Sequence, residues 1–418
     1  MTAVAARSAR PSGDWRLLVA AFWITSMVEG IGVSQVFAFL PSYLREMGVA
    51  EADRLTFVGL FGSLLFVVGA PLVPLWGVWA DKYSRKAVIV RSAIVEAVVL
   101  AGVASSREPW QLALSLLLIG LQLGNTGVML AAIRDATPRR RLGTTIGLFG
   151  ASGPVGFAVG PVLGGFLVDG LGQPLAAVFW LSAALSVATA VIVTFGTREV
   201  RPEVVPEGRV LRLAYGAIRG VLADPAVRRI FAIYGVAFLA NQMARPYVPV
   251  LVEQLTGAGP GLASAIALVA GTAALAGALV SPLGGAIGDR IGFMPVLLGA
   301  LAGAGVALGL MPLAPAVPVL AAVALLLAAS FAAVSAMVFS LLATGVPPER
   351  RSATLNLVYL PLYAAGIVGP AVGGVVATVG GAPGPFLAGS AVFLAGAAAV
   401  ALRRPRGYSG RSRSEGPV

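Results

Sequence analysis

Glu29 is the residue whose type and position most clearly indicate chemistry. It stands in the stretch SMVEGIGVSQ, inside an apolar run that begins after Trp15 and reaches Phe39. At about 1.5 Å per residue it lies roughly 20 Å along a helix, near the centre of a ~30 Å hydrocarbon layer. A charge at that depth costs about 2.5–3.5 kcal/mol, so a carboxyl group there can exchange a proton near neutral pH. The alternative is a carboxyl that hydrogen-bonds to Ser26 or to a neighbouring helix and does not titrate.

Other polar side chains recur in apolar stretches at helical spacing. Asn241 and Arg245 are four residues apart in NQMARPYVPV, and Gln122 and Asn125 are three apart, so each pair shares a helix face. Arg245 either complements the charge of Glu29 or extends its long side chain toward the membrane surface. Further candidates, for function or for helix packing, are Glu96, Asn356, Tyr359 and Tyr363.

The absence of histidine and cysteine narrows the chemistry open to this chain. Without them there is no thiolate or imidazole to bind zinc or to activate a nucleophile, and proton handling must use carboxylates. No P-loop pattern for ATP binding occurs either. The sequence therefore predicts no enzyme and no ATP-driven pump, and it predicts no cofactor and no metal site.

The composition indicates an all-α membrane protein. Of the 418 residues, 58% are hydrophobic and 11% are charged, and the mean hydropathy is +0.89, whereas a soluble domain has about 25% charged residues. A helix needs roughly 20 apolar residues to cross a bilayer, and about twelve such stretches occur. We expect these spans to begin near Arg16, Leu55, Ala87, Trp110, Leu142, Leu175, Ile230, Leu262, Phe293, Val317, Ser352 and Pro385.

The basic residues fall on alternate sides of these spans. With the N-terminus in the cytoplasm, the 30 Lys and Arg residues all lie in cytoplasmic loops or tails, except Arg45, Arg54 and Arg107 outside and Arg245 within a span. This is the positive-inside pattern of a multi-pass cell-membrane protein with both termini in the cytoplasm. The net charge of +12 therefore reflects membrane orientation, and we expect no nucleic-acid partner.

The two halves of the chain repeat one another. Asp81 of GVWAD recurs as Asp289 of GAIGD, and GPVLGG from Gly160 recurs as GPAVGG from Gly369. Repeated halves are common among transporters, and we expect two homologous six-helix bundles around a central cavity. The predicted parts are a cytoplasmic tail 1–14, a bundle 15–197, a cytoplasmic linker 198–229, a bundle 230–402 and a cytoplasmic tail 403–418.

Two motifs carry a resemblance to the major facilitator superfamily, in particular to its twelve-span drug:proton antiporters. GVWADKYSRK, from Gly77, is similar to the family's loop signature G-x-x-x-D-[RK]-x-G-R-[RK], with Ser84 in place of the second glycine. GFAVGPVLGG, from Gly156, resembles the signature of the family's antiporters and drug exporters. The exit of the first span, FLPSYLREMGV, also resembles the multidrug exporters, and the resemblance covers nearly the whole chain.

The resemblance implies roles for several groups of residues. Spans one, four, seven and ten would line the central cavity, and the loop would latch the halves together on the cytoplasmic side; alternatively its charges only set orientation. Small residues let helices approach closely in lipid. The implied cavity residues are Glu29, Gln122, Asn125, Asn241, Arg245, Asn356 and Tyr359; the gating residues are Gly77, Asp81, Lys82, Arg85, Lys86, Asp289 and Arg290; the packing residues are Gly156, Gly160, Pro161, Gly164, Gly165, Gly369 and Pro370.

One departure from the family pattern bears on proton coupling. Many of the family's proton-coupled exporters carry an arginine in span four, four residues before a glycine that corresponds to Gly124. Here that place is taken by Gly120. Either another residue such as Arg245 replaces the arginine, or coupling is absent.

The expected function is secondary active transport of a small molecule by alternating access. The leading hypothesis is proton-coupled efflux of drugs or amphipathic compounds, with Glu29 as the coupling site. The alternatives are uniport or symport of a metabolite such as a sugar or an organic anion, with Arg245 holding the anion, and lipid translocation without a proton step. The expected partners are the substrate, protons and the lipid bilayer, and the protein is expected to be a monomer.

Overall fold

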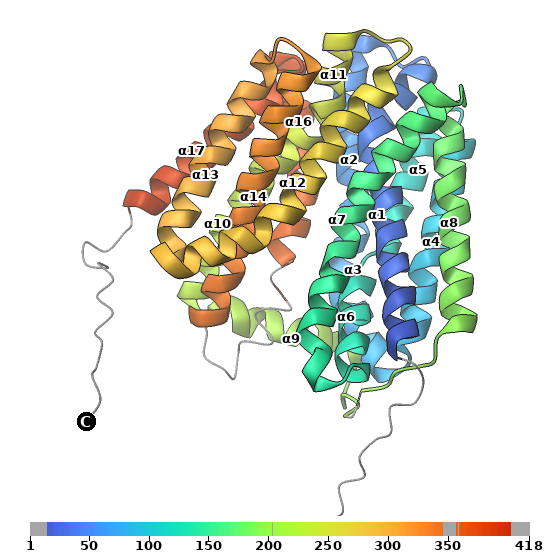
Figure 1. Ribbon diagram of the computed structural model, residues 1–418, viewed down its shortest axis with the longest axis vertical. Coiled ribbons are helices and arrows are strands. Elements are labelled where there is room, and N and C mark those ends of the chain that lie inside the picture. The colour runs from blue at the N-terminus through green and yellow to red at the C-terminus, as the bar shows by residue number, and fades with distance from the viewer. Residues whose placement is uncertain (1–14, 203, 346–356, 358, 403–418) are drawn as a thin grey trace, which may run out of the picture. The chain divides into compact units, whose positions relative to one another are not determined.

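Helices form every regular element in the computed structural model, which describes residues 15–202, 204–345, 357 and 359–402 (Figure 1). Ten candidate membrane spans occur in this part of the chain, together with a shorter apolar helix over Leu262–Gly277. These findings confirm the predicted fold class, an all-α membrane protein. The number of twelve spans stays a prediction, because the expected seventh span is not among these ten and the expected eighth corresponds only to the shorter apolar helix.

The contacts between Cα atoms divide the chain into two compact units. The first consists of the described residues of Met1–Val36 and Leu64–Ala217, and the second of those of Phe37–Ser63 and Ile218–Val418. Helices α1 (Trp15–Glu46) and α2 (Glu51–Val67) therefore contribute to both units. The homology of the two sequence halves, and the bundle boundaries expected from it, stay predictions.

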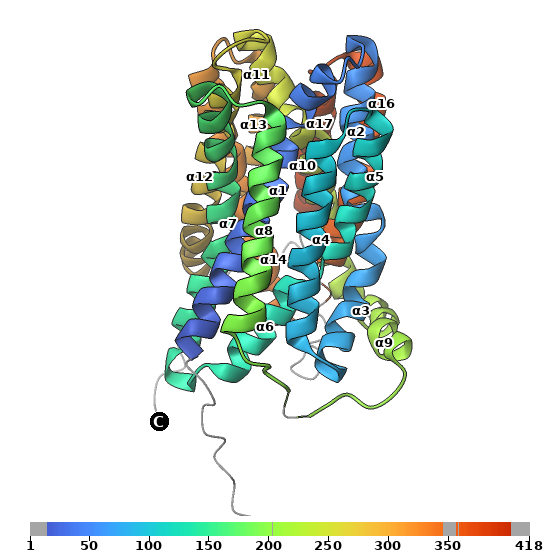
Figure 2. The same cartoon turned by 90° about the vertical axis from the view of Figure 1, so that its right-hand side faces the viewer.

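The first unit is a bundle in which α4 packs along α8 on one side and against α5 on another (Figure 2). Its core is a cluster of buried apolar side chains contributed by six helices, including Phe22, Ile89, Met129, Phe149 and Val193. The remaining elements of this unit are α3 (Gly69–Lys82), α4 (Arg85–Ser105), α5 (Pro109–Ile119), the 3₁₀ turn Gly120–Gln122, α6 (Asn125–Ala136), the 3₁₀ turn Arg139–Arg141, α7 (Leu142–Gly165), the π-turn Phe166–Gly170, α8 (Leu175–Gly196) and the start of α9 (Val210–Ala223).

The second unit has a core built largely from aromatic and small apolar side chains. The ring of Phe238 lies 4.7 Å from that of Tyr234 and 4.8 Å from that of Phe331, both edge to face, a favoured aromatic geometry. Its elements, besides the parts of α1, α2 and α9, are α10 (Pro225–Ala244), the 3₁₀ turn Arg245–Tyr247, α11 (Val248–Thr256), α12 (Leu262–Ile291), α13 (Phe293–Leu310), the 3₁₀ turn Met311–Leu313, α14 (Val317–Gly345), α16 (Leu360–Gly380) and α17 (Gly384–Leu402).

Several expected spans are interrupted rather than continuous, and the second already changes from α2 to α3 at Val68. The fourth breaks between α5 and α6, where Gly124 has φ +98°, a left-handed conformation that glycine adopts at little cost. The seventh breaks at Arg245–Tyr247, where Pro246 has no N–H to continue the helical ladder. In membrane transporters, interrupted helices are where backbone groups become available to a ligand.

Candidate functional site

Glu29 meets a side-chain amide at the break in the fourth span. Asn125, the first residue of α6, donates a hydrogen bond from Nδ2 to Oε1 of Glu29 on α1. Asn125 is 3% exposed, whereas Glu29 is only partly buried. A solute that reaches this part of the first unit can therefore contact the carboxylate, while the amide that orients it stays covered.

Arg91 of α4 supplies a positive charge beside this pair. Its Nη2 donates to the carbonyl oxygens of Gln122 at 3.3 Å and Leu123 at 3.2 Å, which lie at the break in the fourth span. Its guanidinium carbon lies 3.7 Å from the centroid of the Trp76 ring, a cation–π contact. Arg91 and Glu29 also interact electrostatically.

Arg91 was missed by sequence reasoning, which counted it among the cytoplasmic charges. It is the seventh residue of α4, so at about 1.5 Å per residue it lies roughly 9 Å inside the helix. Its spacing from Glu96 in the apolar run RSAIVEAVVL is the signal that could have found it, because two charges within one apolar helix are rare unless they serve a site.

The side chain of Gln122 belongs to the same cluster. It is 4% exposed, and within the described residues its Oε1 has no hydrogen-bond partner. The ring nitrogen of Trp76 and two nitrogens of Arg91, Nε and Nη1, are likewise buried without a partner in this part of the chain. A buried polar atom without a partner costs about 1–3 kcal/mol. Polar ligand atoms or water that bind to this cluster would therefore be stabilised by these atoms. No group of side chains that could hold a metal ion occurs among the described residues.

The remaining predicted cavity residues lie in the second unit or outside the described residues. Asn241 and Arg245 are partly exposed, and the guanidinium carbon of Arg245 lies 4.2 Å from the centroid of the Phe37 ring. Tyr359 is 49% exposed and its ring lies 6.2 Å from that of Phe339. Asn356 lies outside the described residues. The predicted polar ring draws on both units, and it stays a prediction.

The predicted gating loop is held by a network of ion pairs within the first unit. Arg85 is 2% exposed and donates from Nε to Asp81 at 2.8 Å and from Nη1 to Asp135 at 2.7 Å. Glu199, beyond the end of α8, accepts from the backbone N–H of Arg85 at 2.9 Å and from the hydroxyl of Ser84. Ser84, the departure from the family signature, is thus the N-cap of α4. Neither Asp135 nor Glu199 was predicted.

The lysines of the loop contact backbone carbonyls. Lys82 donates to the carbonyl oxygen of Gly208 at 2.5 Å, and Lys86 to that of Thr197 at 2.8 Å. Gly77 has open space around it. Asp289 and Arg290 of the second unit are exposed at the end of α12.

The predicted packing residues lie where helices approach closely. A Cβ on Gly160 would collide with Ile31 and Ser34 of α1, and one on Gly156 would collide with Met27. In the second unit, a Cβ on Gly369 of α16 would lie 2.7 Å from Gln242 of α10. The other members, Pro161, Gly164, Gly165 and Pro370, are buried.

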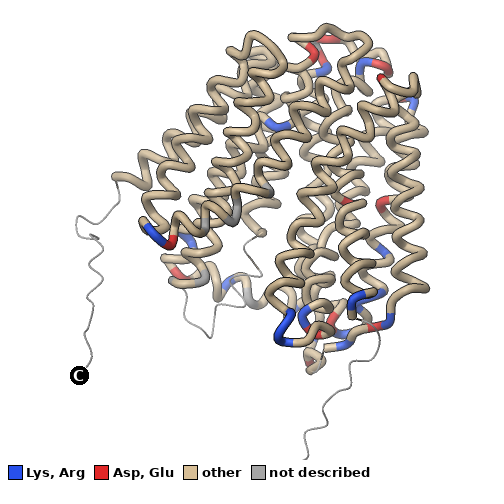
Figure 3. Tube along the Cα trace, viewed as in Figure 1, with Lys and Arg blue, Asp and Glu red and all other residues tan. Residues whose placement is uncertain are grey.

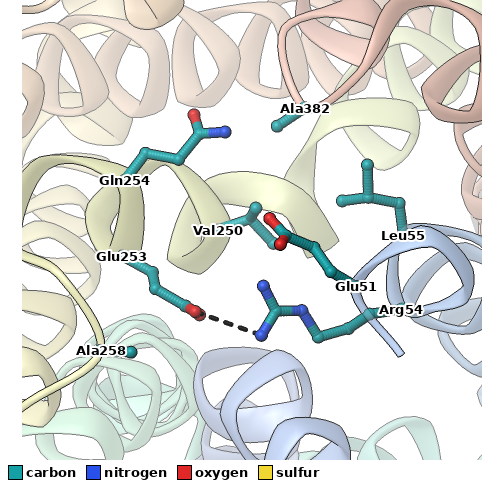
Figure 4. Close-up of a pocket in the computed structure, with 8 residues that line it drawn as sticks. All are labelled: Glu51, Arg54, Leu55, Val250, Glu253, Gln254, Ala258 and Ala382. Atoms are coloured by element: carbon teal, nitrogen blue, oxygen red, sulfur yellow. Dashed lines mark ion pairs between the residues drawn. The ribbon is translucent and has the colours of Figure 1, made fainter. Parts of the chain in front are cut away.

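The second unit also contains a cavity that the sequence did not predict. Its volume is about 190 Å³, and Figure 4 shows its eight lining residues. Glu253 of α11 pairs there with Arg54 at 3.2 Å and also with Arg45 at 2.8 Å, so two arginines share one carboxylate. The lining residues are Glu51, Arg54, Leu55, Val250, Glu253, Gln254, Ala258 and Ala382.

In the part of the chain that the structure describes, charged residues gather near the helix ends and few lie mid-helix (Figure 3). Interrupted apolar helices, small-residue contacts and a buried polar cluster together define a polytopic membrane transporter. The family model of the Major Facilitator Superfamily matches residues 22–267 and 230–417. The chain belongs to this superfamily and is a secondary active transporter rather than an enzyme.

Named relatives and solved structures agree with this membership. The chain is 30% identical over 290 residues to the multidrug resistance protein MdtG of Citrobacter koseri, covering 69% of this chain and 70% of that one. It is 28% identical over 297 residues to MdtG of Yersinia enterocolitica, covering 71% and 70%. Its fold is similar to that of the nucleoside transporter NupG, with a TM-score of 0.76 and 16% identity, covering 92% of this chain and 99% of that one. It is also similar to the fold of the human organic anion transporter MFSD10, with a TM-score of 0.67 and 20% identity, covering 93% of this chain and 100% of that one.

Proposed function

We propose that this transporter exports amphipathic, chiefly cationic compounds in exchange for protons, with Glu29 as the coupling site. The observation that carries the proposal is the partly exposed carboxyl of Glu29, which accepts from Asn125 and interacts with Arg91 in the interior of an apolar unit. The similarity to proteins named for multidrug resistance supports export of drug-like compounds.

The exchange follows from one carboxylate that has two competing ligands. Either a proton or a cationic headgroup can neutralise Glu29, but its single negative charge cannot bind both at the same time. The buried amide of Asn125 holds the carboxylate in place for either ligand. When the site is open to the outside it takes up a proton, and when it is open to the cytoplasm it releases the proton and takes up the cation.

The gate, the cavity and the membrane topology complete the proposal. Alternating access would expose the cavity residues Glu29, Gln122, Asn125, Asn241 and Arg245 to each side in turn, and the network around Asp81 and Arg85 would control the cytoplasmic side. The basic loops support a position in the cytoplasmic membrane with both termini in the cytoplasm. The protein would act as a monomer.

The test is proton exchange by the purified full-length protein in liposomes. Ethidium, a fluorescent monocation, is the probe, and a pH dye inside the vesicles reports proton movement. The wild type should move protons when ethidium is added, and Glu29→Gln should abolish this response. Glu207→Gln removes an exposed carboxylate by the same chemistry and is the matched control. Unchanged proton movement in Glu29→Gln would show that coupling resides elsewhere.

A second candidate function rests on Arg245. Arg245 begins the 3₁₀ turn that interrupts the seventh span, and its guanidinium lies over the ring of Phe37. At such a break the guanidinium could hold an organic anion. An anion carrier would lose substrate affinity in Arg245→Gln and keep it in Glu29→Gln. The exporter would show the opposite order with ethidium.

A further inference from the structure

Away from the helix ends, the described helices of the first unit carry three charged side chains. Glu29 lies on α1, and Arg91 and Glu96 lie on α4. Helices α5, α7 and α8 carry none. One guanidinium therefore accompanies two carboxyl groups in the apolar interior of this unit.

Glu96 has surroundings very different from those of Glu29. It is 0% exposed, and within the described residues neither of its carboxyl oxygens has a hydrogen-bond partner. A Cβ on Gly32, one helical turn after Glu29 on α1, would lie 2.6 Å from Oε1 of Glu96, so the carboxyl is directed at α1.

The hydroxyl of Ser186 on α8 is the polar group next to Glu96. Its Oγ donates to the carbonyl oxygen of Ser182 at 2.9 Å, and it also lies beside the Glu96 carboxyl. A hydroxyl both donates and accepts, so Ser186 can accept from a carboxyl that carries its proton or turn its hydrogen toward a carboxylate. This neighbour therefore accommodates both protonation states of Glu96.

The three charges interact through a medium of low dielectric. Glu96 and Glu29 interact electrostatically, as do Glu29 and Arg91. An uncompensated charge in such a place costs several kcal/mol, so the cluster is most stable when its net charge is zero. With Arg91 at +1, neutrality requires one carboxylate and one protonated carboxyl.

We propose that Glu29 and Glu96 share a single proton that is balanced by Arg91, and that the cluster releases this proton when it binds a monovalent cation. In the empty cluster one proton and Arg91 balance two carboxylates. In the loaded cluster the cation takes the place of the proton, and the net charge is again zero. The exchange is then one proton for one monovalent cation and is electroneutral.

The exposure of the two carboxyls sets the order of steps. Glu96 has no contact with solvent, so its proton passes to Glu29, which is partly exposed, and from there to water. Glu96 is then the carboxylate that Arg91 balances, and Glu29 is free for the cation. This proposal rests on the function proposed above and adds to it a second proton-holding residue and a fixed stoichiometry.

The first test counts protonated carboxyls without any substrate. Infrared absorption of the carboxyl C=O stretch is recorded on the purified protein in liposomes at pH 7.5, and each variant is subtracted from the wild type. Glu96→Gln and Glu29→Gln should each lose the same single band, because Arg91 then balances the remaining carboxylate. Arg91→Gln should gain a second band, and Glu207→Gln should change nothing. A band that persists in Glu29→Gln would overturn the proposal, since Glu96 would then be a permanently neutral structural acid.

The second test uses ethidium in the same liposomes. The wild type should release one proton per ethidium without moving net charge. Glu96→Gln should bind ethidium more weakly and release no proton although Glu29 is intact, and Glu96→Asp should restore release and control for folding. Proton release by Glu96→Gln at the wild-type ratio would refute the shared proton while leaving efflux in place. A wild type that shows the carboxyl bands above but moves no ethidium would refute the proposed export of this cation and leave the shared proton standing.

Discussion

The side-chain amide of Asn125 donates a hydrogen bond to Glu29 across two helices of the first unit. Asn125 reaches this position because Gly124 takes a left-handed conformation and restarts the helix at Asn125. The amide therefore sits at the N-terminal, positive end of α6, where a negative charge is favoured. The break in the fourth span thus places a donor and the positive end of a helix dipole on one carboxylate.

Asn125→Ala should weaken cation binding without unfolding the protein. The lost hydrogen bond stabilises the charged form of the carboxylate by about 1–3 kcal/mol, so the affinity for ethidium should fall about tenfold. The loss should be larger at pH 6 than at pH 8, because protons then compete better for Glu29. Fluorescence titration of ethidium measures this, with the exposed neighbour Thr126→Ala as control. A loss of affinity, relative to the wild type, that is the same at both pH values would contradict the role of Asn125.

Lysine should not replace arginine at position 91 without a loss of stability. The guanidinium donates to two carbonyl oxygens and a hydroxyl from one nitrogen while its face lies on Trp76. A lysine ammonium keeps the charge but has no planar face and no fork of donors. We expect a loss of roughly 1–2 kcal/mol in the free energy of unfolding.

Thermal unfolding in detergent measures this loss. Trp76→Phe should produce a smaller effect in the same direction, because phenylalanine is a weaker cation–π partner than tryptophan. Trp180→Phe, at a position that is 51% exposed, is the matched control. An Arg91→Lys variant as stable as the wild type would show that the stacked geometry contributes little.

Helical periodicity and intramembrane charge predicted part of this site and missed part of it. Glu29, Gln122 and Asn125 could be found because each is polar within an apolar run, and the three lie in one cluster of the first unit. Arg91 could not be found in the same way, because it follows a basic loop and the charge pattern fits equally well if it belongs to that loop. Whether Arg91 lies in the loop or in the helix depends on where α4 begins, and a sequence locates the start of a helix only to within a few residues.

Contacts between distant parts of the chain were beyond sequence reasoning. Glu199 closes the loop network through Ser84 and Arg85, more than 110 residues earlier. Nothing in the local pattern around Glu199 distinguishes it from any acidic residue of a polar linker. The small residues were easier to interpret, because Gly156 and Gly160 have a spacing that itself specifies close helix approach.

Gly156→Leu should destabilise the first unit strongly. A side chain at this position would collide with the backbone of Met27 and Gly30, which cannot move without separating α1 from α7. Overpacking of this kind costs typically 1–3 kcal/mol. Gly147 of the same helix has open space around it, so Gly147→Ala should be neutral or stabilising by up to about 1 kcal/mol. The melting temperature in detergent should fall for Gly156→Leu and stay unchanged or rise for Gly147→Ala, and an equal fall in both variants would contradict the packing role.

Glu253→Gln should be the most harmful single change around the cavity of the second unit. Both Arg45 and Arg54 pair with its Oε1, and the side chains of Arg54 and Glu253 are 10% and 11% exposed. Removing one partner of a largely buried ion pair leaves an uncompensated charge, which costs about 3–5 kcal/mol. Arg45→Gln should cost less, because the side chain of Arg45 is 32% exposed and water screens its charge.

A double variant separates charge from packing at this cavity. Because Arg54→Gln removes the guanidinium that Glu253→Gln leaves unpaired, the pair of changes should be less destabilising than Glu253→Gln alone. High salt should reduce the loss of unfolding free energy that Arg45→Gln causes and leave the loss from Arg54→Gln nearly unchanged, since salt screens buried ion pairs less. Gln254→Ala changes a neutral residue of the same cavity and is the control. Additive losses in the double variant would mean that Glu253 and Arg54 stabilise the unit independently rather than as an ion pair.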